Sequence, residues 1–156
     1  ESMIAYLRQT AAETHFMVRL PEEVDFTLEE EERILRNIRK SDKDLMLAAF
    51  DGDRVVGNVG VHIFHDRTKV RHRSSLGIAI IQEYCSSGLG TILMERGIDF
   101  AKKAGFEQLE LGVFADNDRA LHLYKKMGFE EIGRIPRAFR LPDGSYIDEI
   151  TMVKML

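Results

Sequence analysis

The chain has 156 residues, 44% of them hydrophobic, and its 26 acidic and 22 basic side chains give a formal net charge of −4. This is the length of one ordinary domain, and it suffices to bury a hydrophobic core without disulfides or metal ions. Proteins that bind duplex nucleic acid owe their affinity to an excess of Lys and Arg, so the charge argues against a nucleic-acid partner.

The sequence also indicates the cellular compartment and whether a segment could span a membrane. Its single cysteine, Cys85, cannot form an internal disulfide, which is typical of a reducing compartment. The longest apolar runs, residues 45–50 and 76–81, are six residues each, against the roughly 18–20 needed to span a bilayer. No basic stretch followed by an apolar stretch is found at the start. We therefore expect a cytoplasmic protein with no membrane partner.

Two amphipathic helices are expected first. Apolar residues recur at helical spacing from the first turn, so the chain is expected to begin inside a helix. A second helix is expected from Thr27, which with Glu30 matches a capping box. The apolar positions are Met3, Ile4, Leu7 and Ala11 in the first helix, and Leu28, Ile34, Leu35 and Ile38 in the second.

The pattern then changes to strands. Asp51-Gly52 predicts a hairpin turn between strands over residues 45–50 and 55–65, and a third strand is expected over residues 71–81. Four basic residues alternate along this part of the chain and are expected to line one solvated face of a strand. They are Arg67, Lys69, Arg71 and Arg73.

A strand, a glycine-containing loop and a helix follow one another over residues 76–101. Such a junction presents unpaired N–H groups and the positive end of a helix dipole, which suits a phosphate or pyrophosphate. Gly88 and Gly90 would let the backbone approach the anion closely. A dinucleotide fingerprint needs a glycine in place of Leu93, and a Walker loop needs a lysine that is absent here. A plain tight turn is the alternative.

A second motif follows the strand expected over residues 106–114. Asn117 is a favourable helix N-cap, and Gly128 is placed to close the helix in a left-handed conformation. Tyr124 lies two helical turns after Asn117 and shares its face. The alternative for Tyr124 is a core tyrosine whose hydroxyl bonds to the backbone.

These two motifs resemble the signatures of the GCN5-related N-acetyltransferase (GNAT) superfamily. The first is residues 82–91, and the second is Asn117, Ala120, Leu123, Tyr124, Gly128 and Phe129. The resemblance covers residues 45–156 and, loosely, the two N-terminal helices. Residues 137–152 are similar to the closing hairpin of the bacterial branch that acetylates small amines or protein amino groups. The resemblance to the GNAT superfamily implies one α/β domain over residues 1–156. Its sheet is expected to be mixed, centrally splayed and flanked by helices, with the family's first strand missing.

The resemblance implies an enzyme that transfers an acetyl group from acetyl-CoA directly to a primary amine, namely a polyamine, an amino acid, an aminoglycoside or a protein amino group. It also implies a homodimer, since related enzymes are often dimers. A non-catalytic acyl-CoA-binding or sensing module is the alternative.

The resemblance also implies the site residues. The Tyr124 hydroxyl would lie beside the sulfur and protonate the departing thiolate, and Asn117 would bind the pantetheine arm. The remaining acetyl-CoA-binding residues are Ile78, Ala79 and Ile80 on the splayed strand, for the acetyl and pantetheine end, and Cys85, Ser86, Ser87, Gly88, Leu89, Gly90 and Thr91 around the pyrophosphate.

Three points stay open. Ser75 stands where several relatives carry a glutamate, so the general base is Glu110, His72 or a water relay. Cys85 and Ser86 replace the Arg or Gln and the Gly of many relatives, which predicts weaker acetyl-CoA binding, and Cys85 is not expected to act as a nucleophile. Seven acidic residues within residues 21–32 either attract a cationic acceptor or form a solvated helix start. The histidines show no metal-ligand spacing beyond His62 and His65, so no metal is expected.

Overall fold

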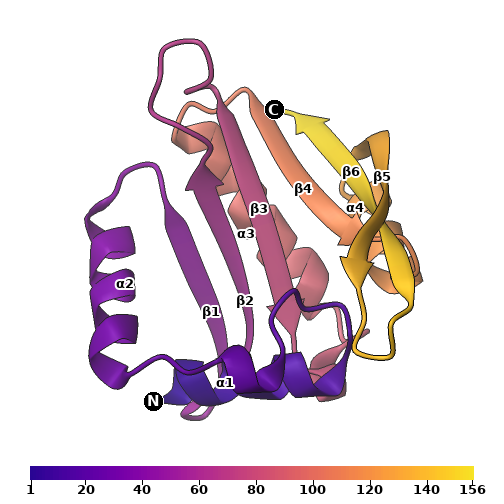
Figure 1. Ribbon diagram of the computed structural model, residues 1–156. Helices are drawn as coiled ribbons and strands as arrows, with labels where there is room; N and C mark the ends of the chain where they lie inside the picture. Colours follow the sequence, from indigo (N-terminus) through magenta and orange to yellow (C-terminus); the bar gives the residue numbers. More distant parts are fainter.

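The computed structural model describes all residues, 1–156. Six strands form one mixed sheet in the order β1-β2-β3-β4-β6-β5, in which only β3 and β4 are parallel neighbours (Figure 1). The strands are β1 (Leu45–Asp51), β2 (Arg54–Ile63), β3 (Arg73–Ile80), β4 (Gln108–Phe114), β5 (Glu130–Arg140) and β6 (Tyr146–Met155). The helices are α1 (Ser2–Glu13), α2 (Leu28–Lys40), α3 (Leu89–Lys103) and α4 (Asp118–Lys126), with 3-10 turns at Pro21–Glu23 and Gln82–Tyr84. The expected mixed α/β fold is confirmed.

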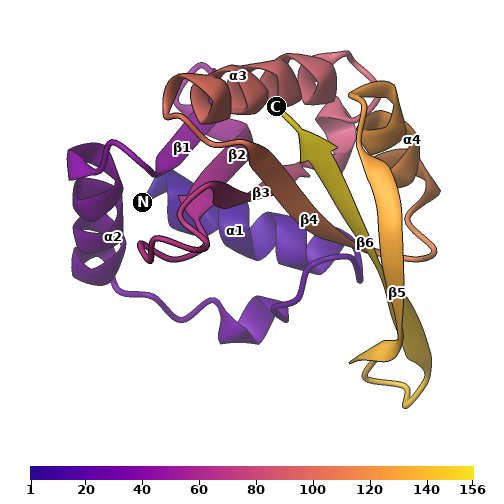
Figure 2. The same ribbon diagram turned by 90° about the horizontal axis from the view of Figure 1, so that it is seen from above.

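Helices cover both faces of the sheet. Figure 2 shows α3 and α4 on one face and α1 on the other, with α2 beside β1. Gly97 lets α3 approach the sheet, since a Cβ there would lie 3.1 Å from side-chain atoms of Leu76 and Val59. The main core therefore lies under α3, and a smaller one under α1 consists of Tyr6, Val55, Val56 and Ile81. None of the four helices combines the length and the apolar character needed to cross a membrane.

Local signals in the first half are confirmed, with shifted ends. The Thr27 hydroxyl accepts the N–H of Glu30 at 3.2 Å, and the Glu30 carboxylate accepts the N–H of Thr27 at 2.9 Å, which completes the capping box. The hairpin between β1 and β2 turns at Gly52-Asp53, one residue later than predicted, and Gly52 has a φ of +57°. Positive φ at the first central residue of a two-residue turn favours glycine at this position.

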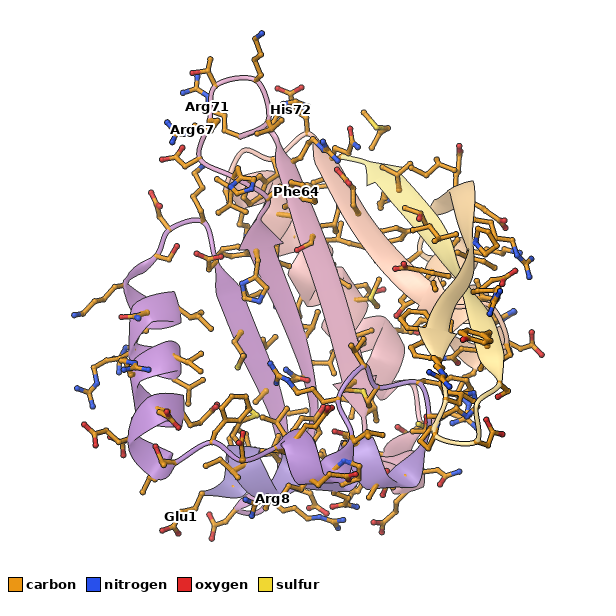
Figure 3. The ribbon with its side chains drawn as sticks, viewed as in Figure 1. Glu1, Arg8, Phe64, Arg67, Arg71 and His72 are labelled. Atoms are coloured by element: carbon orange, nitrogen blue, oxygen red, sulfur yellow. The ribbon has the colours of Figure 1, made fainter.

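The second expected helix forms as α2, although Leu28 and Ile34 stay 43% and 37% exposed. One expectation is wrong. The basic run does not line a strand, because β3 begins only at Arg73. Arg67, Lys69 and Arg71 precede it in a loop closed by the bond from the Val70 N–H to the Arg67 carbonyl. Figure 3 shows Arg67, Arg71 and His72 together at the end of the sheet opposite α1.

The sheet splits between β3 and β4. The two strands pair only from Arg73 to Ser75, opposite Gln108 to Glu110, and diverge from Leu76 onward (Figure 1). The Ile81 N–H donates to Val56 on β2, so by strand alternation the polar backbone groups of Leu76, Ile78 and Ile80 point away from β2. β3 therefore presents unpaired N–H and C=O groups to the gap.

Candidate active site

A cleft of about 880 Å³ opens at the split between β3 and β4. Its walls come from the end of α1 and the loop after it, β3, the loop before α3, β4, α4, β5 and β6. The predicted site residues on β3, Ile78, Ala79 and Ile80, all line it. So do Cys85, Ser86, Gly88, Gly90, Thr91, Asn117 and Tyr124. Ser87 and Leu89 instead line a smaller hollow of about 370 Å³ beside Phe50 and Tyr84.

The three residues on β3 have different surroundings. The side chains of Ile78 and Ile80 pack against the core under α3, while their polar backbone groups face the cleft. Ala79 faces the other way, and its carbonyl accepts a hydrogen bond from the Tyr6 hydroxyl at 2.7 Å. The N–H groups of Ile78 and Ile80 are therefore the donors that β3 offers to a ligand.

The loop before α3 is built to hold an anion. The backbone N–H groups of Ser86, Ser87, Gly88 and Gly90 donate no hydrogen bond within the protein. Ser86 and Gly88 have φ angles of +63° and +90°, and a loop that turns in this way gathers successive N–H groups into a concavity. The dipole of α3 adds positive potential at the same point.

A lysine completes this end of the cleft. The Nζ of Lys126, near the end of α4, donates to the Thr91 hydroxyl at 3.2 Å and brings a full positive charge to the loop. Sequence inspection missed Lys126 because it searched for a cation near the loop in sequence, and the two residues are 35 positions apart. The one usable signal was its place in the last turn of the second motif.

The oxygen and the nitrogen of the Asn117 carboxamide have different surroundings. Its Oδ1 accepts the N–H of Ala120 at 3.2 Å and so caps α4, as the sequence predicted. Its NH₂ group makes no bond to the protein, and the residue lines the cleft. The carboxamide can therefore donate to a ligand while it holds the helix start.

Tyr124 lies at the junction of core and cleft. The residue is only 7% exposed and packs against Phe129, yet its hydroxyl has no hydrogen-bond partner in the protein. Every side-chain oxygen or nitrogen that is fully enclosed does have a partner, so the Tyr124 oxygen must reach the cleft. The alternative of a core tyrosine bonded to backbone is therefore wrong. Burial also raises the pKa of Tyr124 to about 12.

The comparisons with known proteins agree with this geometry. The chain matches the acetyltransferase (GNAT) family over residues 5–129. The chain belongs to the GNAT family. It is 31% identical over 111 residues, 70% of this chain and 67% of the relative, to the L-amino acid N-acetyltransferase AaaT of Escherichia coli. The chain thus spans about two thirds of that relative.

Solved GNAT structures share its whole fold. A GNAT-family acetyltransferase from Streptococcus pneumoniae superimposes with a TM-score of 0.94 at 33% identity, over 99% of this chain and 92% of that one. A phosphinothricin acetyltransferase from Sinorhizobium meliloti, crystallised with acetyl-CoA, gives a TM-score of 0.85 at 19% identity, over 99% and 82%. At that identity the second likeness shows the fold alone.

In this GNAT domain the candidate bases named from sequence lie away from the cleft. Arg73 donates to both carboxylate oxygens of Glu110 at 2.6 and 2.8 Å, and Glu110 does not line the cleft. His72 lies in the loop at the opposite end of the sheet (Figure 3). The seven acidic residues of residues 21–32 also lie outside the cleft lining.

Cys85 forms part of the GNAT loop without a reactive partner. Its Sγ faces the carbonyls of Ile80 and Ile81 at 3.8 and 3.7 Å, and no histidine contacts it. This agrees with the interpretation of Cys85 as a small loop residue.

Proposed function

We propose that the protein transfers the acetyl group of acetyl-CoA directly to a primary amine. The observation that carries this proposal is the unpartnered Tyr124 hydroxyl, which faces a split sheet whose edge and adjoining loop offer free N–H donors. A hydroxyl and a row of amides without partners are costly in a folded protein unless a ligand or solvent satisfies them. Here they lie in one cleft.

The residues present fit acetyl-CoA. The free N–H groups of Ser86, Ser87, Gly88 and Gly90, with Lys126 beside them, match a pyrophosphate in charge and hydrogen bonding. The open edge of β3 and the Asn117 amide match the polar groups of a pantetheine arm. When bound, acetyl-CoA supplies an acetyl thioester, whose carbonyl carbon is open to attack by an amine.

The chain's own groups then have distinct tasks. The N–H groups of Ile78 or Ile80 stabilise negative charge on the acetyl oxygen, since they point into the gap and are held there by the sheet. The Tyr124 hydroxyl supplies a proton to the departing sulfur. Because its pKa is raised to about 12, the hydroxyl stays protonated throughout the physiological pH range and serves as an acid. The cleft walls hold both reactants in one orientation.

The acceptor amine is a polyamine, an amino acid, an aminoglycoside or a protein amino group. An amine with a pKa near 10.4 is almost wholly protonated at pH 7, so a proton must be removed before it attacks.

The proposal is tested by measuring release of the CoA thiol from acetyl-CoA against one amine of each class, with acetyl-CoA binding followed by calorimetry. We expect acetyl-CoA to bind and turnover to occur with at least one class. Binding without turnover across the whole panel would contradict the proposal and would favour a non-catalytic acyl-CoA-binding module.

A further inference from the structure

On the α1 face of the cleft, one lining carboxylate has no partner. Glu149 lies on β6, opposite Phe114 of β4 and Ile135 of β5. Its carboxylate covers Gly112 of β4: a Cβ at Gly112 would lie 2.8 Å from the Glu149 Cδ and would overlap Oε1. It forms no ion pair or hydrogen bond with the protein, and since no fully enclosed polar atom lacks a partner, its oxygens reach the cleft.

We propose that Glu149 binds the ammonium group of the acceptor and acts as its general base. The proposal rests on the function proposed above and assigns the one proton transfer that was left without a residue. The other charged groups along this face are already paired, Glu110 with Arg73 and Asp116 with His15 at 2.7 Å. Asp118 is also unpaired, but it belongs to α4 on the α3 face, so Glu149 is the carboxylate of the α1 face that is free to receive a cation.

Glu149 and Tyr124 approach the split from opposite faces of the sheet. Phe114, directly opposite Glu149, contacts Phe16 of the loop after α1, so Glu149 is on the α1 face. Tyr124 packs with Val113 and Ile150 in the core under α3. An acid on one face and a base on the other suit a reaction in which the nucleophile enters from one side and the leaving group departs from the other.

The surroundings of Glu149 indicate the class of acceptor. Phe139 stacks on Phe114 with ring centroids 3.7 Å apart, and Phe16 lies edge-on to Phe114 at 6.0 Å. A bulge in β5 sets Phe139 there: the Asp148 carboxylate accepts the Arg137 N–H at 2.8 Å, and Arg137 has a φ of +54°. Next to the free carboxylate, the cleft thus has an aromatic wall.

The Lys and Arg side chains that line the cleft lie on the other face. The basic residues of the lining, Arg119, His122 and Lys126, all belong to α4, which lies on the α3 face (Figure 2). A free amino acid would bring its own carboxylate next to Glu149 and Asp116, where the one nearby basic side chain, His15, already pairs with Asp116 and no Lys or Arg lines the cleft. The acceptor is therefore a primary amine on an apolar group, without a carboxylate on the adjoining carbon.

The proton balance closes with these two side chains. Glu149 takes one proton from the ammonium group and passes it to solvent, and the neutral nitrogen forms the N–C bond. As the C–S bond breaks, the sulfur takes the Tyr124 proton. The second proton that the nitrogen loses replaces the one that Tyr124 gave. The sum is an amide, a thiol and one released proton, and no further reactant is needed.

The first test compares Glu149→Gln with Glu131→Gln, a carboxylate on β5 that does not line the cleft. We expect Glu149→Gln to bind acetyl-CoA like the wild type and to lose about 100-fold or more in kcat. Its kcat/KM should rise about tenfold per pH unit below the amine pKa, because only the neutral amine then reacts, whereas the wild type should show a shallower slope. Unchanged kcat or slope, in an enzyme that acetylates amines, would overturn the role of Glu149 alone.

A second test moves the carboxylate to the neighbouring strand. Gly112 has no left-handed φ, and the nearest atoms to a Cβ there belong to Glu149. Glu149→Ala together with Gly112→Asp therefore returns a carboxylate to the same point of the cleft. We expect kcat of this double variant to be at least tenfold higher than kcat of Glu149→Ala. Absence of recovery, with the protein folded and acetyl-CoA bound, would contradict a role set by the position of the carboxylate.

The acceptor class is tested with matched probes. Phenethylamine and phenylalanine differ by one carboxylate, and phenylalaninamide carries a neutral group in its place. We expect kcat/KM for phenethylamine and phenylalaninamide to exceed that for phenylalanine by tenfold or more. Equal or better use of phenylalanine would overturn the inference about the acceptor.

Discussion

Removal of the hydroxyl should lower the stability of the protein at one buried tyrosine and its turnover at the other. Tyr6 and Tyr124 are 2% and 7% exposed, so burial does not distinguish them. The Tyr6 hydroxyl lies 2.7 Å from the Ala79 carbonyl and 2.8 Å from the Asn58 Oδ1, whereas the Tyr124 hydroxyl has no partner. Tyr6→Phe leaves a buried acceptor unpaired and should lower the free energy of unfolding by about 1–3 kcal/mol.

Tyr124→Phe removes no hydrogen bond, so we expect a change in the free energy of unfolding of less than about 0.5 kcal/mol. Its effect should fall on kcat, which loses the proton donor to the sulfur and should drop by about 10²–10⁴-fold. Acetyl-CoA affinity should hardly change, since the hydroxyl is one contact among many in the cleft.

The pair of variants is measured by urea denaturation, calorimetry with acetyl-CoA and thiol release with a working amine. Tyr6→Phe serves as the control for a structural hydroxyl. Equal turnover of Tyr124→Phe and wild type would refute the acid role. A loss of stability in Tyr124→Phe as large as that in Tyr6→Phe would show that the Tyr124 hydroxyl has a structural partner, and the reasoning from its missing bond would fail.

Three further outcomes follow from the same contacts. Lys126→Gln should weaken acetyl-CoA binding about 3–10-fold by calorimetry with kcat unchanged, while Lys125→Gln should not. Gly88→Ala forces a side chain into a φ of +90° and should cost about 1–2 kcal/mol in urea denaturation, whereas Gly133→Ala, in open space without positive φ, should cost less. Folding raises the Tyr124 pKa from 10.0 to about 12, so stability should be lost as pH rises through this window, less steeply in Tyr124→Phe; equal slopes would contradict this.

Features set by short-range contacts were predictable from sequence. The capping box of Thr27 and Glu30 and the Asn117 cap each depend on residues three positions apart. Spacing also placed the glycine loop before a helix and Tyr124 on the face of Asn117, because the chain itself holds these groups together. Their roles in binding and catalysis came from the resemblance to the GNAT superfamily and not from spacing.

Sequence patterns were insufficient where contacts between residues far apart in the sequence determine the structure. The alternating basic residues at positions 67–73 were expected to line one face of a strand, but Arg67, Lys69 and Arg71 lie in a turn and β3 begins only at Arg73. The second expected helix forms as α2, but it lies at the β1 edge, where Leu28 and Ile34 stay partly exposed. Neither the turn nor this exposure is visible in local periodicity.

The proposed general base, Glu149, also could not be predicted from the sequence. The sequence offered Glu110 on β4 as a candidate base, but its carboxylate is already paired with Arg73. The carboxylate that reaches Gly112 comes from β6, which the sheet order places beside β4 although Glu149 is far away in sequence. Side chains of cross-strand neighbours on one face of a sheet lie close enough to reach the same point. The carboxylate beside Gly112 therefore comes from a strand that only the register of the sheet brings there.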